Sequence, residues 1–223
     1  NSESLQGSGQ LPKFSNESFK CSNDDLWLSP TAEVPLTAFH KNEIINPKLL
    51  PIKYVAYSPC FRREVGAHGL SDRGIWRVHQ FTKIEQIIIS HPDDSWDHHE
   101  DLLKNCIDLW DELGLHYEVV NICTGDMGTV AARKYDLEAW LPGAKEFKEV
   151  VSCSNCTDYQ SRRLEVRYGQ AGKGKDDGNA KKVYVHMLNS TLSATERALC
   201  CLLENYQTPD GVRVPEVLQP FMM

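Results

Sequence analysis

Charged and aromatic side chains that could bind a nucleotide alternate along the chain between Tyr54 and Ile89. Alternate residues of a strand share a face, so the second part of this segment would present one set together: Arg77, His79, Phe81, Lys83 and Glu85. Arg62 and Glu64 would share a face in the first part. Arginine pairs with phosphate or carboxylate through two parallel hydrogen bonds, and an aromatic ring can stack on a base. The pattern indicates either a nucleotide site or a solvated sheet face whose ion pairs contribute about 0–1 kcal/mol each.

A β-hairpin would position these side chains. Two stretches rich in Val, Ile, Tyr, Phe and Trp flank a segment that contains Gly66, Gly69 and Gly74. Such stretches predict two antiparallel strands, and the glycines between them predict a long, mobile connection.

The composition is that of a folded domain with an acidic balance. A chain of 223 residues with 41% hydrophobic residues is expected to form one domain with a proper core. With a formal charge of -7, the chain lacks the overall basic character of a self-sufficient nucleic-acid binder, so any contacts with nucleic acid would be local. The sequence has no apolar run of about 20 residues, and its start has no secretory pattern, so we expect a soluble protein that is not secreted.

The eight cysteines are scattered, mostly among apolar neighbours, as buried reduced thiols are. This favours a reducing compartment. Cys153 and Cys156 form one CxxC pair, which could be half of a zinc site or a redox pair. Because no second pair of matching spacing accompanies it, two buried thiols are the favoured interpretation.

Residues 1 to 30 are polar and are expected to form a loop rather than a separate domain. Leu26 to Leu36 is expected to be an edge or bent strand, because Pro30 and Pro35 limit regular pairing. From the residues alone, Glu33 in this segment would be a turn glutamate bonded to the local backbone.

A packing helix is predicted from Pro92 to Leu113, with acidic residues at its start and Gly114 at its end. Its inner face would carry residues at helical spacing: Trp96, His99, Leu103, Cys106 and Trp110. Adjacent residues of a helix do not face each other, so His98 and His99 are expected to be surface or half-buried residues rather than metal ligands.

Three further strands are predicted after this helix: Tyr117 to Cys123, Lys134 to Leu141, and Glu146 to Ser154. The last two would form a hairpin around a PGAK turn. Asp136 and Glu138 are expected to face outward as solvated acids.

The final segment, Val183 to Tyr206, is predicted to be a strand followed by a helix with Leu199, Leu202 and Leu203 on its apolar side. Arg197 in that helix would ordinarily be a snorkelling or salt-bridged arginine. Gly169 to Lys182 is expected to be a mobile surface loop, and it lacks the phosphate-binding P-loop pattern.

FRRE, a glycine-bearing loop and RVHQFTKIEQ resemble motif 2 of the class II aminoacyl-tRNA synthetases, and in particular the family specific for serine. The segments TAEVPLT, DLEAWLPG, VVSCSNCTDYQSRR, HMLNSTLSATER and LLENYQTPDGVRVPEVL resemble that family in the same order, so the resemblance covers nearly the whole chain. It implies an α+β fold, a mainly antiparallel sheet flanked by helices. Motif 2 would span about residues 54–89 and motif 3 about 183–206, with residues 1–223 forming part of a catalytic domain that a tRNA-binding arm and motif 1 normally precede.

The implied activity is ATP-dependent activation of L-serine to seryl-adenylate, followed by transfer to the 3′ end of tRNA(Ser). The resemblance also implies ATP as a substrate and Mg²⁺ as a cofactor. It implies a homodimer of the full-length protein and a location in the cytoplasm. Two alternatives stay open: a homologue that loads an amino acid onto a carrier protein, and an inactive paralogue used for binding. Ser190, Leu192 and Glu196 replace glycines common in the family, a pattern closer to eukaryotic cytosolic members.

The resemblance also implies roles for individual residues. The serine site would comprise Thr31, Ala32, Glu33, Arg62, Glu85, Asn189 and Thr191. The ATP site would comprise Arg62, Arg63, Glu64, Val78, His79, Gln80, Phe81, Glu149, Val150, Val151, Ser152 and Arg197. Arg62 and Arg197 would be the catalytic residues, and Glu149 with Ser152 would hold Mg²⁺; one carboxylate suffices because Mg²⁺ keeps waters and phosphate oxygens as further ligands.

Overall fold

A six-stranded antiparallel sheet, in the order β2-β3-β8-β6-β5-β4, forms the centre of the computed structural model, which describes residues 1–65, 74–169 and 183–222. Its strands in chain order are β2 (Ile52–Phe61), β3 (Gln80–Ser90), β4 (Tyr117–Asn121), β5 (Arg133–Leu141), β6 (Glu146–Asn155) and β8 (His186–Ala194). Every pair of neighbours in this sheet is antiparallel. The predicted α+β architecture is therefore confirmed.

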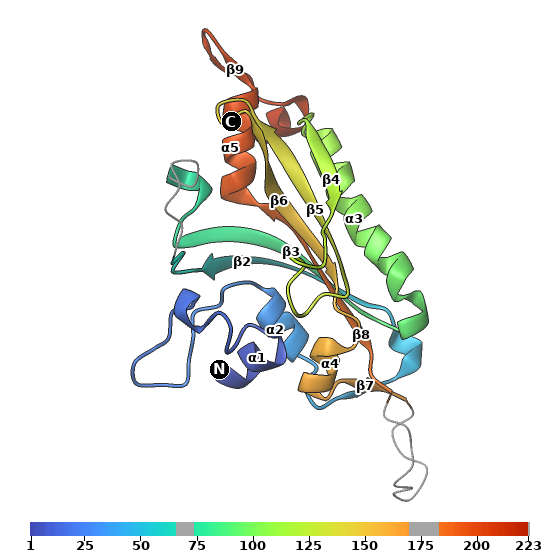
Figure 1. Cartoon of the computed structure of the whole chain (residues 1–223). Helices are drawn as coiled ribbons and strands as arrows, with labels where there is room; N and C mark the ends of the chain where they lie inside the picture. The colour runs from blue at the N-terminus through green and yellow to red at the C-terminus, as the bar shows by residue number, and fades with distance from the viewer. Residues whose placement is uncertain (66–73, 170–182, 223) are drawn as a thin grey trace, which may run out of the picture.

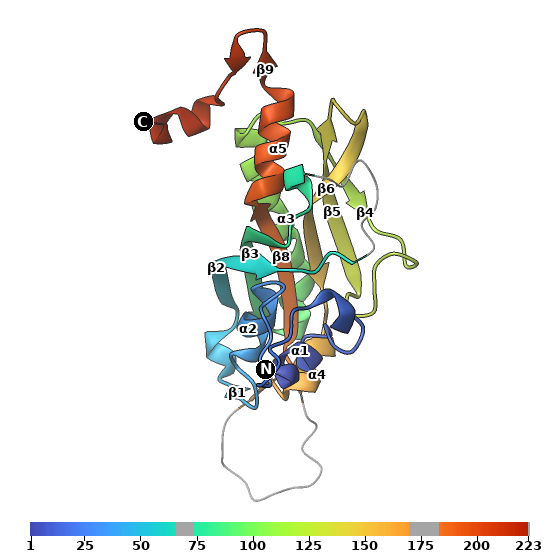
Figure 2. The same cartoon turned by 90° about the vertical axis from the view of Figure 1, so that its left-hand side faces the viewer.

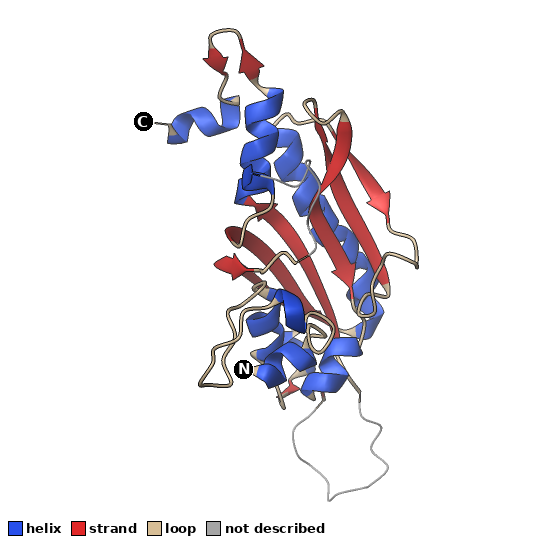
Figure 3. Cartoon of the chain, turned by 60° about the vertical axis from the view of Figure 1, so that its left-hand side comes forward, coloured by secondary structure: helices blue, strands red, loops and turns tan. Residues whose placement is uncertain are grey.

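One long helix lies along this sheet, three short helices gather at one of its ends, and a further helix lies at the opposite end (Figure 1, Figure 3). They are α1 (Ser2–Gly7), α2 (Glu33–Ala38), α3 (Ser95–Glu112), α4 (Tyr159–Leu164) and α5 (Thr195–Asn205). The long helix α3 packs along one face, over β8, β6 and β3, whereas α1, α2 and α4 contact one another at the end where the N-terminus lies. The described part of the chain ends at the opposite side of the molecule, beyond α5 (Figure 2).

Short elements complete the fold. The two-residue strands β1 (Ile44–Ile45) and β7 (Arg167–Tyr168) pair in parallel, and β9 (Gln207–Thr208) and β10 (Gly211–Val212) pair antiparallel. Single turns of 3₁₀ helix occur at Ser15–Glu17, Pro47–Leu49, Gly74–Trp76 and Pro92–Asp94, and a longer one at Glu216–Phe221.

The largest core cluster joins α3 to the sheet and to α5. Cys106 and Trp110 of α3 pack with Leu137 and Val151 of the sheet and with Cys201 of α5, and all five are at most 1% exposed. The predicted packing helix is thus confirmed, with Gly114 just past its end at a φ of +64°, a conformation that glycine adopts without strain.

Two details of that helix differ from the prediction. Trp96, expected on the inner face, is 43% exposed near the start of the helix. His99, expected at the surface or half-buried, is fully buried: its ring stacks on Tyr135, with centroids 5.1 Å apart, and its Nε2 lies 3.1 Å from the carbonyl of Cys153. A neutral imidazole with an aromatic neighbour and a backbone partner can be buried, so the helical spacing that placed His99 on the inner face was the better guide.

The two predicted hairpins are confirmed: β2 pairs with β3, and β5 pairs with β6. The final strand and helix are also present, but the strand extends to Ala194 and the helix begins only at Thr195. Leu199 and Leu203 are exposed, whereas Ala198 and Cys201 are buried, so the helix is rotated relative to the predicted apolar side.

The segment from Leu26 to Leu36 is not a strand, because α2 begins at Glu33. Pro35 is the third residue of α2. The N–H groups of the first helical turn have no acceptor within the helix, so the N–H that proline lacks costs no helical hydrogen bond there. The polar start, predicted to be a loop, also contains α1, whose first residues are capped by the Asn1 side chain. The strand prediction was wrong because it relied on the prolines, and the loop prediction missed α1 because it relied on polar composition.

Asp136, predicted to be a solvated acid, is 5% exposed. Lys134 forms an ion pair with it at 3.0 Å, and the Ser152 hydroxyl donates to it from β6, so part of the cost of burying its charge is offset. Burial and nearby Glu149 raise its pKa to about 6. Glu138, two residues along, is half-buried.

The CxxC cysteines lie in the core, where Cys153 Sγ donates to the carbonyl of His99 and Cys156 Sγ accepts from Asn189. No cluster of three or more His, Cys, Asp or Glu side chains suited to a metal ion occurs within residues 1–65, 74–169 and 183–222. In the same ranges no helix combines the length and apolarity needed to cross a bilayer. The predicted loop at residues 170–182 and most of the hairpin connection lie outside the described residues.

Candidate active site

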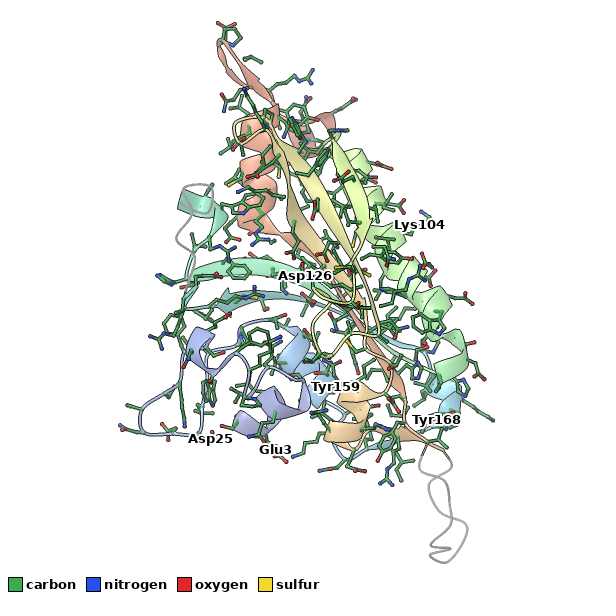
Figure 4. The ribbon with its side chains drawn as sticks, in the orientation of Figure 1. Glu3, Asp25, Lys104, Asp126, Tyr159 and Tyr168 are labelled. Carbon is green, nitrogen blue, oxygen red and sulfur yellow. The ribbon has the colours of Figure 1, made fainter. Side chains whose placement is uncertain are left out.

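A cavity of about 240 Å³ opens beside β3, and most of the residues that carry the predicted chemistry line it. Its walls come from segments far apart in the sequence: Gln10, Thr31, Glu33, Arg62, Glu64, Ile75, Trp76, Arg77, Val78, Phe81, Lys83, Glu85, Glu149, Val150, Ser152, Asn189, Thr191, Ala194, Glu196 and Arg197. Figure 4 shows the side chains that crowd the region between β3, β6 and the helices at the N-terminal end.

One end of the cavity is a buried polar network centred on Lys83. Its Nζ lies 2.5 Å from Glu85 Oε2 and donates to Thr31 Oγ1 at 2.9 Å. Thr191 Oγ1, on the adjacent strand β8, donates to the same Glu85 oxygen at 3.5 Å. All four side chains are less than 10% exposed. These groups could bind a small polar ligand such as a hydroxyl, and a ligand without one would leave them unpaired.

Glu33 lies at the same end, at the first position of α2. Two amide groups, Gln160 Nε2 and Asn189 Nδ2, donate to its Oε1 at 2.6 and 3.2 Å. Burial, together with the neighbouring charge of Glu85, raises the pKa of Glu33 to about 7. A buried carboxylate of this kind is a natural partner for an ammonium group, which would supply the missing positive charge.

Arg62 lies where the two ends of the cavity meet. Its Nε donates to the carbonyl of Pro30 at 3.2 Å, and its guanidinium lies 5.2 Å from the centroid of the Phe81 ring. The backbone N–H of Arg62 donates to His79, which continues the β2–β3 pairing and fixes where the side chain emerges.

Glu64 also lines the cavity, two residues beyond Arg62. It has a φ of +50°, a left-handed conformation that is uncommon outside glycine and turns the chain at this point. Its Oε2 accepts from Arg77 Nη1 at 2.7 Å. A strained backbone at a cavity wall is typical of residues held in place for binding.

A β-bulge brings Glu149 and Ser152 to the same cavity wall. Residues three apart normally face opposite sides of a strand. In β6, however, Glu149 pairs with Glu138 and Val151 with Leu137, which leaves Val150 as an extra residue between them. Both side chains therefore line the cavity.

Arg197 lines the other end of the cavity. Its Nη1 donates to the Glu149 carbonyl at 2.7 Å, and its guanidinium lies 5.2 Å from the centroid of the Trp76 ring. The preceding residue, Glu196, accepts the backbone N–H of Thr82 at 2.8 Å, where β8 no longer pairs with β3. The first turn of α5 is thus bound directly to the strand that carries Phe81.

Five of the predicted site residues do not line the cavity: Ala32, Arg63, His79, Gln80 and Val151. Arg63, His79 and Gln80 are exposed, whereas Ala32 and Val151 are buried. The other predicted site residues are brought together.

For several residues of the site no role was predicted from the sequence. Alternation placed Lys83 on the face of Phe81 and Glu85, which was a usable signal. Arg77 belongs to the same alternating set, whereas Trp76 and Glu196 adjoin motif residues but have no distinguishing spacing. Gln160, which lies behind Glu33, comes from a helix that no pattern connected to the site.

The cavity therefore combines a closed end suited to an ammonium and a hydroxyl with an open, arginine-lined end suited to a phosphorylated purine. Residues 17–206 match the family model described as tRNA synthetase class II core domain (G, H, P, S and T). The chain belongs to this family, as the resemblance implied.

Within the family, the chain is similar to proteins named for serine. It is 56% identical over 222 residues to the serine--tRNA ligase of Prochlorococcus marinus (strain MIT 9515), which covers 99% of this chain and 50% of that protein. It is 54% identical over 217 residues to the cytoplasmic serine--tRNA ligase of Arabidopsis thaliana, covering 96% of this chain and 47% of that protein. The chain spans about half the length of the curated relatives it matches. These similar identities do not single out the eukaryotic cytosolic branch.

Among solved structures, the chain is also similar to enzymes named for serine. The seryl-tRNA synthetase of Pyrococcus horikoshii complexed with ATP matches with a TM-score of 0.91 and 50% identity, covering 99% of this chain and 48% of that one. The cytoplasmic serine-tRNA ligase of Naegleria fowleri in complex with AMP matches with a TM-score of 0.90 and 48% identity, covering 99% and 51%. A prolyl-tRNA synthetase of Giardia lamblia, 20% identical with a TM-score of 0.79 and coverage of 99% and 43%, shares the fold.

Proposed function

We propose that this chain carries the catalytic site of a serine--tRNA ligase, which activates L-serine with ATP and transfers it to the 3′ end of tRNA(Ser). The observation that carries the proposal is the closed end of the cavity, where Glu33, Glu85 and Thr191 lie within one polar network. The similarity to proteins of that name supports it.

In the first step the serine carboxylate attacks the α-phosphate of ATP, which forms seryl-adenylate and releases pyrophosphate. Glu33 binds the ammonium group, and Glu85 with Thr191 binds the hydroxyl. Arg62, between the two ends, bridges the carboxylate and the α-phosphate and stabilises the charge that develops there. No covalent enzyme intermediate is needed.

The nucleotide would occupy the open end. Phe81 stacks on adenine, Glu64 accepts from its amino group, and Arg197 binds the leaving phosphates. Since catalysis of phosphoryl transfer depends mainly on positioning and charge stabilisation, these contacts suffice without a strong base.

Magnesium fits the residues present at this end. The bulge of β6 brings the Glu149 carboxylate and the Ser152 hydroxyl to one wall, and Asp136, which accepts from Ser152, has an oxygen without a partner among the described residues. Glu149 and Ser152 would hold the ion, and when bound it would neutralise phosphate charge.

In the second step the terminal ribose hydroxyl of tRNA attacks the activated carbonyl. The acceptor is the point that separates the proposal from a homologue that loads a carrier protein. A cytoplasmic location and a homodimer of the whole protein complete the proposal, supported by the cytoplasmic relatives and by the family resemblance.

Serine-dependent conversion of ATP to AMP in the presence of hydroxylamine tests the first step, because hydroxylamine traps the activated serine as a hydroxamate. Radiolabelled serine recovered on tRNA, and not on carrier proteins, tests the second. No hydroxamate with any amino acid would support the inactive-paralogue alternative instead.

A further inference from the structure

Gln160 lies outside the cavity lining, yet it contacts the most important carboxylate of the closed end. It belongs to α4, whose first residue, Tyr159, is labelled in Figure 4. Its side chain is fully buried, and its Nε2 donates both to Glu33 Oε1 at 2.6 Å and to the carbonyl of Ser8 at 3.1 Å. One amide nitrogen therefore joins the N-terminal segment, α2 and α4.

The amide oxygen of Gln160 has no hydrogen-bond partner within the described part of the chain. A buried polar atom without a partner is unfavourable, so stability alone does not account for this glutamine. The nitrogen, in contrast, faces two acceptors, which fixes the orientation of the amide.

The two amides that reach Glu33 converge on a single oxygen. Gln160 and Asn189 both donate to Oε1, so among the residues that the structure describes the other carboxylate oxygen is left for a ligand. The remaining charged or titratable groups that face Glu33 are Glu85 and Lys83 from β3, Arg62 beyond β2, and Cys156 after β6. Among these neighbours Gln160 is a neutral donor that favours the ionised carboxylate without competing with a substrate ammonium.

We propose that Gln160 is a positioning residue for amino-acid binding: it holds Glu33 ionised and oriented so that its second oxygen receives the substrate ammonium. The inference rests on the proposed function in its last part only, because the contact between Gln160 and Glu33 exists whatever the ligand.

The test compares Gln160→Met with Gln86→Met. Methionine has nearly the shape of glutamine but no donor, and Gln86 is a second buried amide, bonded to Asn105 and Cys106 rather than to the cavity. In pyrophosphate exchange, Gln160→Met should raise the KM for serine about 10- to 100-fold, as expected for losing one hydrogen bond to a charged group, with the KM for ATP within about twofold. Gln86→Met should leave both constants near those of the unmodified chain.

A second readout does not depend on activity. The difference in Tm between Gln160→Met and the unmodified chain should widen as pH rises from 6 to 8, because the lost hydrogen bond matters most when Glu33 is ionised. For Gln86→Met the difference should be constant. A widening without any exchange in the unmodified chain would support the positioning of Glu33 and refute the proposed function. Exchange with an unchanged serine KM in Gln160→Met would overturn the inference.

Discussion

The two ends of the cavity are built differently. At the closed end the polar groups are buried and bonded to one another, as Lys83 is to Glu85 and Thr31. At the open end Arg197 is half-buried against the ring of Trp76, and at its border Arg62 is half-buried against the ring of Phe81. A buried, bonded network discriminates between ligands because mismatches leave groups unpaired, whereas arginines on aromatic faces bind any ligand with the right charge and a flat base. We infer that the closed end determines selectivity for the amino acid and that the open end determines kcat.

The largest effect is expected from Glu85→Ala. The substitution removes the proposed hydroxyl partner and leaves Lys83 buried without its carboxylate, so serine-dependent pyrophosphate exchange should fall about 10³-fold or more. ATP binding, measured by titration, should survive. The exposed Glu118→Ala on β4 is the matched control. Undiminished exchange in Glu85→Ala would refute the assignment of this residue.

Arg197→Ala should affect the other end. Loss of the guanidinium that we propose binds the leaving phosphates should lower kcat about 10²- to 10³-fold while the KM for serine changes less than about threefold. Arg162→Ala, which removes an exposed arginine paired with Asp158 on α4, should leave both constants unchanged. A rise in serine KM with unchanged kcat would show that the two ends are not separated as described.

A pH series should distinguish the ends without mutation. Because the pKa of Glu33 is raised to about 7, this carboxyl is increasingly protonated below that pH and can no longer pair with an ammonium. The kcat/KM for serine should therefore fall about tenfold per pH unit below about 7 and level off above it, while ATP binding changes little. A serine kcat/KM that is flat between pH 8 and 6 would contradict the role of Glu33.

The same shift has a consequence for stability. The folded pKa of Glu33 is higher than its usual value of 4.5, so its contribution to stability is full below that value and declines as pH rises toward 7. Denaturant unfolding of Glu33→Gln between pH 5 and 8 should show a smaller decline than the unmodified chain. An equal decline of stability in the variant and the unmodified chain would show that another group is responsible for the pH dependence.

The smallest effect is expected from Glu196→Ala, which removes the acceptor for the Thr82 N–H between α5 and β3. We expect kcat to fall about 3- to 10-fold and the free energy of unfolding by about 1 kcal/mol, the size of one hydrogen bond. Glu196→Gln keeps an oxygen acceptor at the same place and should restore most of kcat. Failure of glutamine to do so would mean that the charge of Glu196, not its hydrogen bond, matters.

Alternation along the strands was enough to predict the two hairpins and part of the site, whereas the mainly antiparallel sheet was implied by the family resemblance. It placed Phe81, Lys83 and Glu85 on one face of β3, and all three line the cavity. Helical periodicity likewise located α3. These signals are local, so a single sequence carries them.

The rest depends on contacts between distant segments. The bulge at Val150, which aligns Glu149 with Ser152, is set by pairing with β5 and has no signature within β6. The burial of Asp136 depends on Lys134 and on Ser152 of the next strand. Gln160 reaches Glu33 across 127 positions of sequence, a distance over which no periodic pattern operates.

Pyrophosphate exchange by the unmodified chain, measured with each of the twenty amino acids in turn, tests the central claim most directly. The polar network of Glu85, Lys83 and Thr191 predicts exchange with serine and at least about 10⁴-fold less with alanine, which lacks only the hydroxyl. Equal exchange with alanine and serine, or exchange that only another amino acid supports, would contradict it.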